Sequence, residues 1–230
     1  MTIDKTLNKE ETPAMFNNIA NTYDKLNHLL SFGLDKRWRK VFVKKLKFRS
    51  YNNIADIASG TGDLLVSLQD LNPDKCYAID PAKNMLEVAK TKIPKAEFII
   101  SEAESLPLKN ESCDLISVSF GIRNFTSLER AFSEFYRILR KGGIVSIMEF
   151  SQPKFFIFRW GFIIYLKLFL PLIGSMVSKD KSAYKYLQTS IFDFAKNVDV
   201  FTALERQNFN KHSQSKFLFG AVRIYTCVKK

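Results

Sequence analysis

The fold is decided by residues 54–63, which read Ile54-Ala55-Asp56-Ile57-Ala58-Ser59-Gly60-Thr61-Gly62-Asp63. Here a short apolar strand runs into a tight glycine turn, and the apolar residues 64–68 that follow are predicted to form a helix. A strand, a glycine loop and a helix in this order form the opening unit of a nucleotide-binding α/β domain. Glycine suits the turn because it has no Cβ, so the backbone can pass close to a ligand.

The residue sequence of the glycine loop distinguishes between two candidate cofactors. A dinucleotide fingerprint reads G-x-G-x-x-G, whereas residues 60–65 read Gly-Thr-Gly-Asp-Leu-Leu and lack the third glycine. Asp63 would also place a carboxylate where a pyrophosphate binds the helix N-terminus. Acidic residues beside the loop suit a ligand with a cationic amino-acid end, and S-adenosyl-L-methionine (AdoMet) has one. The loop therefore favours AdoMet over a dinucleotide.

Predicted strands and helices alternate along the rest of the chain. Strands are expected at 54–58, 76–79, 97–100, 114–119 and 144–150, and helices at 84–90 and 128–139. The second of these helices is expected to stop at Arg140-Lys141-Gly142-Gly143. Residues 216–230 read as strand-turn-strand around Gly220. The pattern predicts an α/β fold with a mostly parallel seven-stranded sheet, helices on both faces and an antiparallel C-terminal hairpin at one edge.

The N-terminal region is predicted to be helical from Pro13 to Phe48, after a flexible polar tail over residues 1–14 without a signal peptide. Asp35 is expected to cap a helix whose apolar side includes Trp38, Val41, Phe42 and Leu46. Residues 15–230 are expected to form a single domain. Within it, residues 15–50 form a helical lid and residues 155–190 an apolar insertion on the substrate side.

Charge and cysteine usage indicate the setting of the protein. The net charge of +12 suggests a polyanionic partner, either nucleic acid or an anionic membrane surface, although an AT-rich genome also enriches lysine. Lys36–Arg49 is more informative than the total, because it holds eight basic residues in fourteen. Cys76, Cys113 and Cys227 form no metal-type or redox-type pair and suit a reducing cytoplasm.

Four loops are expected to meet at the ligand, because an open α/β sheet binds ligands across the carboxyl ends of its strands. Asp80 follows the second strand, twenty-four residues after Asp56, where a carboxylate commonly binds the two ribose hydroxyls. Ser119 follows the fourth strand, beneath the methionine portion. A solvated surface role is the alternative for any single acid. The expected cofactor-binding residues are Asp56, Gly60, Thr61, Gly62, Asp80, Glu102, Ala103 and Ser119.

Several segments together form a longer pattern. They are Phe16–Asp24 with Leu29–Gly33, Asp56–Asp63, Ser119–Asn124, Arg137–Gly143 with Glu149–Pro153, and Tyr184–Leu187 with Ser190–Ile191. This pattern, from about Met15 to the C-terminus, resembles the motifs of the menaquinone/ubiquinone biosynthesis C-methyltransferase family. The resemblance implies a Rossmann-like class I AdoMet-dependent methyltransferase fold, with cofactor contacts at Thr61, Asp80, Glu102, Ala103 and Ser119. The chain departs from the family pattern at Ser59, Glu102 and Asn208.

The resemblance also implies a reaction. Members of this family methylate a ring carbon of a prenylated quinol. We therefore expect conversion of demethylmenaquinol to menaquinol, with the equivalent step of ubiquinone biosynthesis as the alternative. An aromatic carbon is a weak nucleophile until the neighbouring hydroxyl loses its proton, so the site should stabilise a phenolate.

Four residues are the catalytic candidates. Arg123 is a permanent cation that would lower the quinol pKa, and Asn124 would hold the second oxygen. Tyr23 and Asp24 would position the ring or relay a proton, with His28 as a further candidate. A salt-bridge role for Arg123 and a packing role for Tyr23 are the alternatives. No metal is expected.

The most apolar stretch, residues 155–173, suggests where a prenyl tail binds. A transmembrane span is disfavoured because Arg159 and Lys167 would each cost about 2.5–3.5 kcal/mol near the membrane centre. An interfacial helix or the wall of a prenyl tunnel fits better, and an ordinary core helix is the alternative. We expect a cytoplasmic protein that contacts the anionic inner face of the membrane peripherally, with the basic Lys36–Arg49 segment adding attraction to the lipids.

Other classes of function are weaker. A nucleic-acid methyltransferase would explain the positive charge, but it has no use for the apolar residues 155–173, so no nucleic-acid partner is expected. A noncatalytic AdoMet-binding scaffold would not need both Arg123 and Tyr23 beside a full cofactor loop. The oligomeric state is left open, with a homodimer as one candidate.

Overall fold

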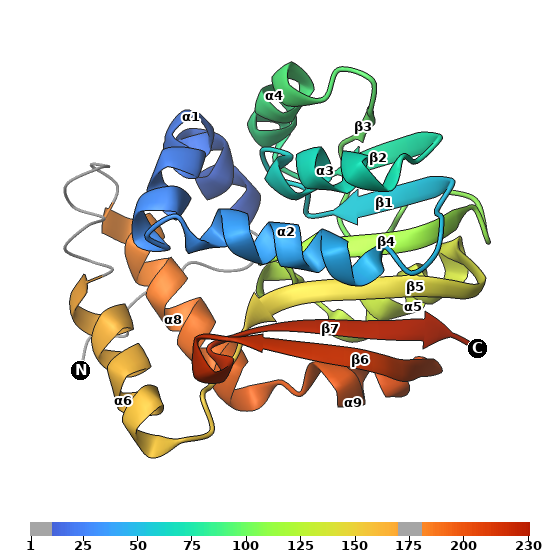
Figure 1. Cartoon of the computed structure of the whole chain (residues 1–230). Coiled ribbons are helices and arrows are strands. Elements are labelled where there is room, and N and C mark those ends of the chain that lie inside the picture. The colour runs from blue at the N-terminus through green and yellow to red at the C-terminus, as the bar shows by residue number, and fades with distance from the viewer. Residues whose placement is uncertain (1–10, 170–180) are drawn as a thin grey trace.

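The computed structural model describes residues 11–169 and 181–230. Its strands form one sheet in the order β3-β2-β1-β4-β5-β7-β6 (Figure 1). Strands β1 to β5 pair in parallel, and β7 runs antiparallel to both β5 and β6. The bounds are β1 Asn53–Ile57, β2 Lys75–Ile79, β3 Glu97–Ile99, β4 Cys113–Ser119, β5 Leu139–Phe150, β6 Phe209–Phe217 and β7 Val222–Lys229. The predicted α/β sheet with its antiparallel C-terminal hairpin is confirmed.

Helices cover both faces of this sheet and one of its ends. Helices α2, α3 and α4 pack on one face, and α5 and α9 on the other, whereas α1, α6 and α8 gather where the parallel strands end (Figure 1). The helices are α1 Thr12–Leu30, α2 Leu34–Leu46, α3 Asp63–Leu68, α4 Lys83–Lys92, α5 Leu128–Ile138, α6 Phe156–Ile164, α8 Lys181–Asn197 and α9 Val200–Glu205. Short irregular turns are η2 Gln69–Leu71, η3 Ile122–Asn124, η4 Tyr165–Phe169 and η5 Leu218–Gly220.

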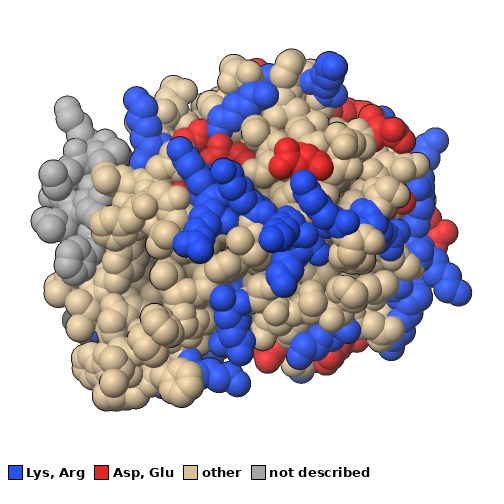
Figure 2. All heavy atoms as spheres, viewed as in Figure 1, with Lys and Arg blue, Asp and Glu red and all other residues tan. Residues whose placement is uncertain are grey.

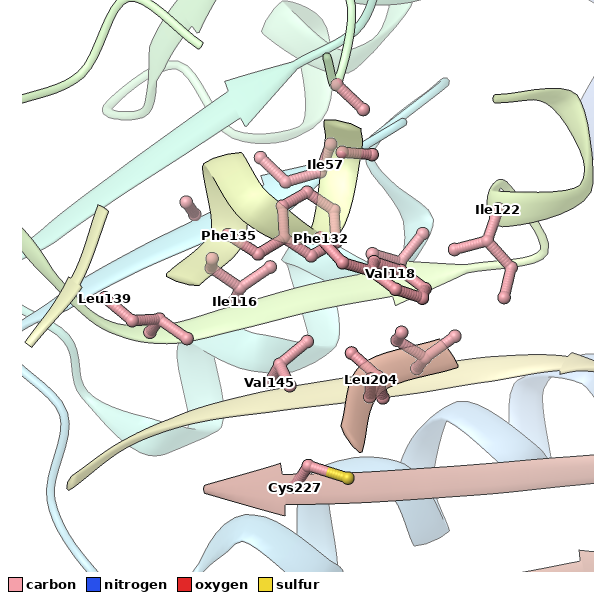
Figure 3. Close-up of a cluster of buried hydrophobic side chains, with 14 of the residues drawn as sticks. Ile57, Ile116, Val118, Ile122, Phe132, Phe135, Leu139, Val145, Leu204 and Cys227 are labelled. Atoms are coloured by element: carbon pink, nitrogen blue, oxygen red, sulfur yellow. The ribbon is translucent and has the colours of Figure 1, made fainter. Parts of the chain in front are cut away.

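Apolar side chains alternate between the two faces of the sheet and form one hydrophobic core on each face. Successive side chains of a strand point to opposite faces, so Ile57 of β1 and Val145 of β5 face α5, whereas Ile144 and Met148 face α2. On the α5 side, Phe132 and Phe135 lie 5.7 Å apart, ring centre to ring centre, over the middle of the sheet (Figure 3). Each such fully buried side chain contributes about 1.5–3 kcal/mol. Both faces of the central strands are therefore apolar, as a parallel sheet requires.

Two predicted strand boundaries are wrong. Helix α5 ends at Ile138 and β5 begins at once at Leu139, which pairs with Cys113 of β4, so the Arg140–Gly143 segment lies inside the strand. Strand β6 begins at Phe209 rather than at 216. It lies at the edge of the sheet and its exposed residues are polar, so it lacks the apolar alternation that marks a buried strand.

The predicted cap of α2 is also wrong. The helix starts at Leu34, one residue after Gly33, whose φ of 73° makes the turn from α1. Asp35 lies within the first turn, and its carboxylate accepts a hydrogen bond from Ser31 of the preceding turn instead. Val43, not Val41, is the buried valine of α2. Helix α2 buries its apolar side against the sheet, while residues of its first turns also line the cavity at the strand ends.

Gly121 sets the spacing between the ends of β1 and β4. A Cβ on Gly121 would lie 2.5 Å from the Cβ of Ala58 and 3.2 Å from Val118 Cγ1. Ala58 itself has φ of 51°, which is unusual for alanine, so this junction has little freedom to adjust. Gly121, the second residue after β4, must therefore be glycine for the two loops to approach each other.

We predict that Gly121→Ala lowers the free energy of unfolding by about 1–3 kcal/mol, because the added methyl group overpacks the junction. Urea denaturation measures the change. Gly161→Ala is the matched control, since no atom lies within 4 Å of a Cβ on that helical glycine. The control is expected to be neutral or stabilising by about 0.5–1 kcal/mol. Equal stability of the two variants would contradict the close approach.

Candidate active site

Asp80 joins the second strand to the glycine loop. Its Oδ2 accepts a hydrogen bond of 2.8 Å from the backbone N–H of Gly60, and its Oδ1 accepts one of 2.8 Å from Ala82. Burial raises the pKa of Asp80 to about 6, although these two hydrogen bonds oppose the rise. The carboxylate that the sequence places at the cofactor is thus buried and fixed in orientation.

A small pocket of about 70 Å³ adjoins Asp80 at the carboxyl ends of the strands. Glu102 and Ala103 line it, with Asn124 at the far side and Phe16 of α1 over it. The structure therefore brings together three of the predicted cofactor residues, namely Asp80, Glu102 and Ala103. Its described lining does not include Ser119, which ends β4 and pairs with Met148.

Asp56 is the second buried acid of this region. Ser117 donates a hydrogen bond of 2.6 Å to its Oδ1, whereas its Oδ2 has no hydrogen-bond partner among the described residues. The buried Ser59 hydroxyl, on the glycine loop, also has none there. Burial raises the pKa of Asp56 to about 7. A cationic group beside these carboxylates would restore their ionised form.

The two glycines of the loop have different roles. Both adopt positive φ, 55° at Gly60 and 78° at Gly62. A Cβ on Gly62 would lie 3.0 Å from the Cβ of Ala89, so this glycine admits α4 rather than a ligand. A Cβ on Gly60 would meet no protein atom within 4 Å. The expectation that a Cβ at either glycine would meet the ligand is wrong for Gly62.

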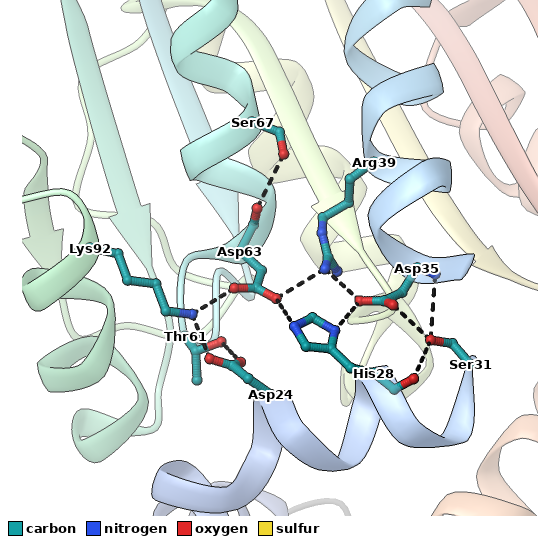
Figure 4. Close-up of polar contacts among 9 residues, drawn as sticks. All are labelled: Asp24, His28, Ser31, Asp35, Arg39, Thr61, Asp63, Ser67 and Lys92. Atoms are coloured by element: carbon teal, nitrogen blue, oxygen red, sulfur yellow. Dashed lines mark hydrogen bonds and ion pairs between the residues drawn. The ribbon is translucent and has the colours of Figure 1, made fainter. Parts of the chain in front are cut away.

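An ion-pair cluster holds α1 against the glycine loop (Figure 4). Asp24 of α1 accepts a hydrogen bond of 2.5 Å from Thr61 of the loop and pairs with Lys92 of α4 at 2.6 Å. Lys92 also pairs with Asp63, at 2.6 Å from its Oδ1. Thr61 was predicted to bind the cofactor and Asp24 to position the ring or relay a proton. In the structure, the Thr61 hydroxyl and the Asp24 carboxylate instead bind each other.

The cluster continues into α2. Arg39 lies 2.5 Å from Asp35 Oδ2 and 3.0 Å from Asp63 Oδ2, and His28 Nδ1 lies 2.6 Å from Asp35 Oδ2 (Figure 4). His28, Asp35 and Asp63 have the spacing of a metal-ligand set, but the guanidinium of Arg39 already lies between the two carboxylates. Asp63, expected to face a cationic ligand, is therefore neutralised by the protein itself.

A much larger cavity, of about 600 Å³, lies beside the small pocket. Its walls are mainly apolar and come from α1, α2, α6, η4, α8, the ends of β4 and β5, and the β6–β7 turn. Leu166 of η4 packs on Leu26 and Leu30 of α1, which closes one side. Phe16 lines both the cavity and the small pocket, so the two spaces adjoin.

Arg123 lines the large cavity and is ion-paired. Its Nη1 lies 3.1 Å from Glu149 Oε1, and both side chains are buried. Nη1 also donates a hydrogen bond to the backbone oxygen of Phe120, while Nε has no partner among the described residues. Burial raises the pKa of Glu149, and the Arg123 charge opposes this rise. The salt-bridge alternative for Arg123 is therefore realised.

Tyr23 and Asn124 lie where the two spaces meet. Tyr23 lines the large cavity, and burial raises the pKa of its phenol, so the phenol stays protonated at neutral pH. Asn124 Oδ1 accepts a hydrogen bond of 3.0 Å from the Tyr186 hydroxyl. Of the predicted catalytic residues, Arg123 and Tyr23 line the large cavity, whereas Asn124 lines the small pocket. The described lining of the large cavity does not include Asp24 or His28.

The sequence analysis assigned no role to four residues of the site, namely Lys92, Arg39, Glu149 and Tyr186. Lys92 and Arg39 had no signal beyond the general excess of basic residues. Glu149 is the one charged residue inside an otherwise apolar strand end, and such a residue points to a buried partner. Tyr186 lay inside a quoted motif without an assigned role.

The geometry agrees with the comparisons with known proteins. A model of the ubiE/COQ5 methyltransferase family matches residues 4–229. The chain belongs to this family. It is 41% identical over 235 residues to the ubiquinone/menaquinone biosynthesis C-methyltransferase UbiE of Campylobacter jejuni subsp. jejuni (serotype O:6, strain 81116 / NCTC 11828), covering 96% of this chain and 98% of that protein. It is 35% identical over 227 residues to the demethylmenaquinone methyltransferase of Bacteroides fragilis (strain YCH46), covering 96% and 93%.

Solved structures of other proteins share the fold of this chain. A SAM-dependent methyltransferase from Thermotoga maritima superposes with a TM-score of 0.63 at 20% identity, over 94% of this chain and 99% of that chain. The [4+2]-cyclase SpnF gives a TM-score of 0.68 at 12% identity, over 97% of both chains. The class I methyltransferase fold predicted from the sequence is confirmed.

The buried acids predict a pH dependence of stability. The pKa of Asp56 rises from an ordinary 3.8 to about 7, so between these values the folded protein keeps a proton that the unfolded chain has released. The free energy of unfolding of the ligand-free protein should therefore fall as pH rises from about 4 to 7, by up to about 1.4 kcal/mol per pH unit.

Thermal unfolding of the wild type and of Asp56→Asn across this pH range tests the effect. We expect the variant to show a flatter decline, with the remainder due mainly to Asp80 and Glu149, whose pKa values are also raised by burial. Parallel curves for the two proteins would show that Asp56 is ionised in the fold throughout.

Proposed function

We propose that this chain transfers a methyl group from AdoMet to a ring carbon of a prenylated quinol, and that its substrate is demethylmenaquinol. The observation that supports this best is the pairing of two spaces at the strand ends. A small pocket walled by acids adjoins a 600 Å³ apolar cavity, with hydrogen-bonding side chains between them. The names of the Campylobacter and Bacteroides relatives refer to the same chemistry.

The residues of the small pocket fit AdoMet. Asp56 lies outside the described lining of the pocket, and burial raises the pKa of its carboxyl to about 7, so a cation bound nearby would favour its ionised form. Asp80 and Glu102 would receive hydroxyl and amine donors, and Ala103 offers an apolar side. When bound, AdoMet supplies an electrophilic methyl group on a cationic sulfur. The protein therefore has only to bind, orient and activate the acceptor.

The large cavity suits a quinol with a tail. Its volume lies within the about 300–1,000 Å³ of ligand pockets that bury most of a drug-sized molecule. Tyr23 and Arg123 are among its polar lining residues, whereas α6 contributes Ile157, Phe158, Gly161 and Phe162, none of which has a polar side chain. A ring bearing hydroxyl groups would bind at the polar end and an isoprenoid chain along the apolar side. Burial of the tail contributes about 0.8 kcal/mol per methylene equivalent.

Activation of the ring requires a stabilised phenolate. The guanidinium charge of Arg123, although balanced by Glu149, lies at the cavity wall and would stabilise the phenolate oxygen. Tyr23 is protonated, so it acts as a hydrogen-bond donor rather than as the base. Asn124 has its amide oxygen occupied by Tyr186, which leaves the amide N–H groups to donate.

Asp24 has a positioning role in this proposal. Its carboxylate binds Thr61 and Lys92, which fixes α1 and hence Tyr23 one residue earlier in that helix. Proximity then supplies much of the rate, because the reaction brings two substrates together in one orientation. Ubiquinone biosynthesis remains the second candidate, since the name of the Campylobacter relative includes both quinones.

Methyl transfer from labelled AdoMet tests the proposal. We expect label in reduced demethylmenaquinol, presented in detergent, and none in bulk RNA. A demethyl-ubiquinol precursor in parallel separates the two quinone pathways. Label in the ubiquinol precursor alone would replace the menaquinone assignment, and label in RNA alone would refute quinol methylation altogether.

A pair of variants separates the structural from the catalytic role of Arg123. Arg123→Met leaves Glu149 buried without its cation and should cost about 3–5 kcal/mol of stability. Arg123→Met/Glu149→Gln removes both charges and should recover most of that loss in urea denaturation. We expect the double variant to remain at least about 100-fold slower in methyl transfer, because the phenolate has lost the guanidinium charge that stabilises it. Recovery of activity together with stability would limit Arg123 to a structural role.

A further inference from the structure

Apolar side chains from three distant segments meet at the opening of the large cavity. Residues that line a cavity and are also exposed to solvent must lie at its mouth. Phe32 of the α1–α2 turn, Ile157 of α6 and Phe219 of the β6–β7 turn meet both conditions, being 72%, 78% and 65% exposed. We call this surface the mouth face; it consists of Leu29, Phe32, Phe155, Phe156, Ile157, Phe158, Trp160, Leu218 and Phe219.

The mouth face is a continuous surface, and its backbone adopts conformations that cost free energy. The rings of Phe158 and Phe219 stack with centroids 3.5 Å apart and an interplanar angle of 6°, which joins α6 to the β6–β7 turn. Helix α6 buries none of its residues. Phe32, Leu218 and Phe219 all have φ between 46° and 56°, a conformation that costs energy for residues other than glycine. The core-helix alternative, made for residues 155–173, is therefore wrong for α6, whereas Leu166 of η4 is buried and residues 170–173 lie outside the described residues.

Basic residues outnumber acidic ones in the segments that form the mouth face. Segments 29–49, 154–168 and 209–219 contain a single acidic residue, Asp35, which is buried and paired with Arg39. Exposed basic residues of these segments are Lys36, Arg37, Lys40, Lys44, Lys45, Lys47, Arg49, Lys154, Lys167, Lys211 and Lys216. In Figure 2 the side occupied by α6 and the β6–β7 turn is largely uncharged, and Lys and Arg side chains gather over α2 next to it.

We propose that the mouth face docks on an anionic phospholipid bilayer and that the prenyl tail of the substrate enters the cavity directly from the lipid. This inference rests on the proposed function for the identity of the substrate. Exposed aromatic side chains beside a basic rim match a lipid surface, in which the rings enter the headgroup region and the Lys and Arg side chains meet the phosphates. None of the helices in the described part of the chain has the length and apolar character to span the bilayer.

The docking variant must spare the cavity. Phe156 and Trp160 are 70% and 53% exposed, their rings are in contact at 6.1 Å, and neither lines the cavity. Phe156→Ser/Trp160→Ser therefore removes two aromatic rings from the mouth face without changing the walls of the site. Val66→Ser is the matched control, because Val66 is an exposed apolar residue of α3 on another part of the surface.

Co-sedimentation with vesicles measures docking. The wild type should bind vesicles of phosphatidylcholine with phosphatidylglycerol more tightly than vesicles of phosphatidylcholine alone, and added salt should weaken this binding. Phe156→Ser/Trp160→Ser should lose about tenfold in affinity for the anionic vesicles, and Val66→Ser should bind as the wild type does. Equal binding by the double variant would overturn the proposal. A loss of self-association in place of vesicle binding would assign the mouth face to a second copy of the chain.

Two forms of the substrate keep this test separate from the proposed function. With a short-tailed demethylmenaquinol analogue in solution, the double variant should match the wild type in rate. With the long-tailed quinol embedded in vesicles, it should be slower by about tenfold. Equal losses on both forms would show damage to the site and overturn the docking role. If neither the wild type nor the double variant methylates either quinol, the proposed function is refuted. The sedimentation result would still test docking independently.

Discussion

The attachment of α1 to the glycine loop is the interaction on which both binding spaces depend. Asp24 reaches Thr61 and Lys92, and through Lys92 the contact continues to Asp63, so one cluster joins α1, the loop and α4. These groups are partly buried, where ion pairs are screened less than in water. Held in this way, α1 places Phe16 over the small pocket and Tyr23 at the wall of the large cavity. The site is thus assembled between a rigid sheet and one tethered helix.

The interior combines satisfied and unsatisfied charges. Arg123 and Glu149 are buried together and balance each other, while Asp56 and Asp80 are buried with raised pKa values and no cation of their own. An enzyme built only for stability would replace such groups by apolar ones. Their presence at the ends of β1 and β2 concentrates the destabilising features of the fold where a ligand would compensate for them.

The central part of the fold could be predicted because it rests on local rules. The glycine loop, the period-two apolar strands and the C-terminal hairpin each have a short-range signature, and the sheet follows from their order. The convergence of Asp80, Glu102 and Ala103 followed from the same topology. The edge strand β6 and the start of β5 could not be predicted, because their pairing depends on neighbours far away in sequence. The partners of Asp24 and Asp63 were hidden for the same reason, since Lys92 is 68 and 29 residues away from them.

The position of Phe16 affects how ligands enter the small pocket. The small pocket holds only about 70 Å³ while Phe16 and its helix lie over it, which is room for a few water molecules and far less than a nucleoside ligand occupies. Its lining includes the exposed Glu102, so the pocket reaches the surface beside this residue. The large cavity opens elsewhere, between α6 and two surface turns, and its mouth is formed in the present arrangement. The two spaces thus reach the surface at separate places, so a ligand in one of them does not block the entry to the other.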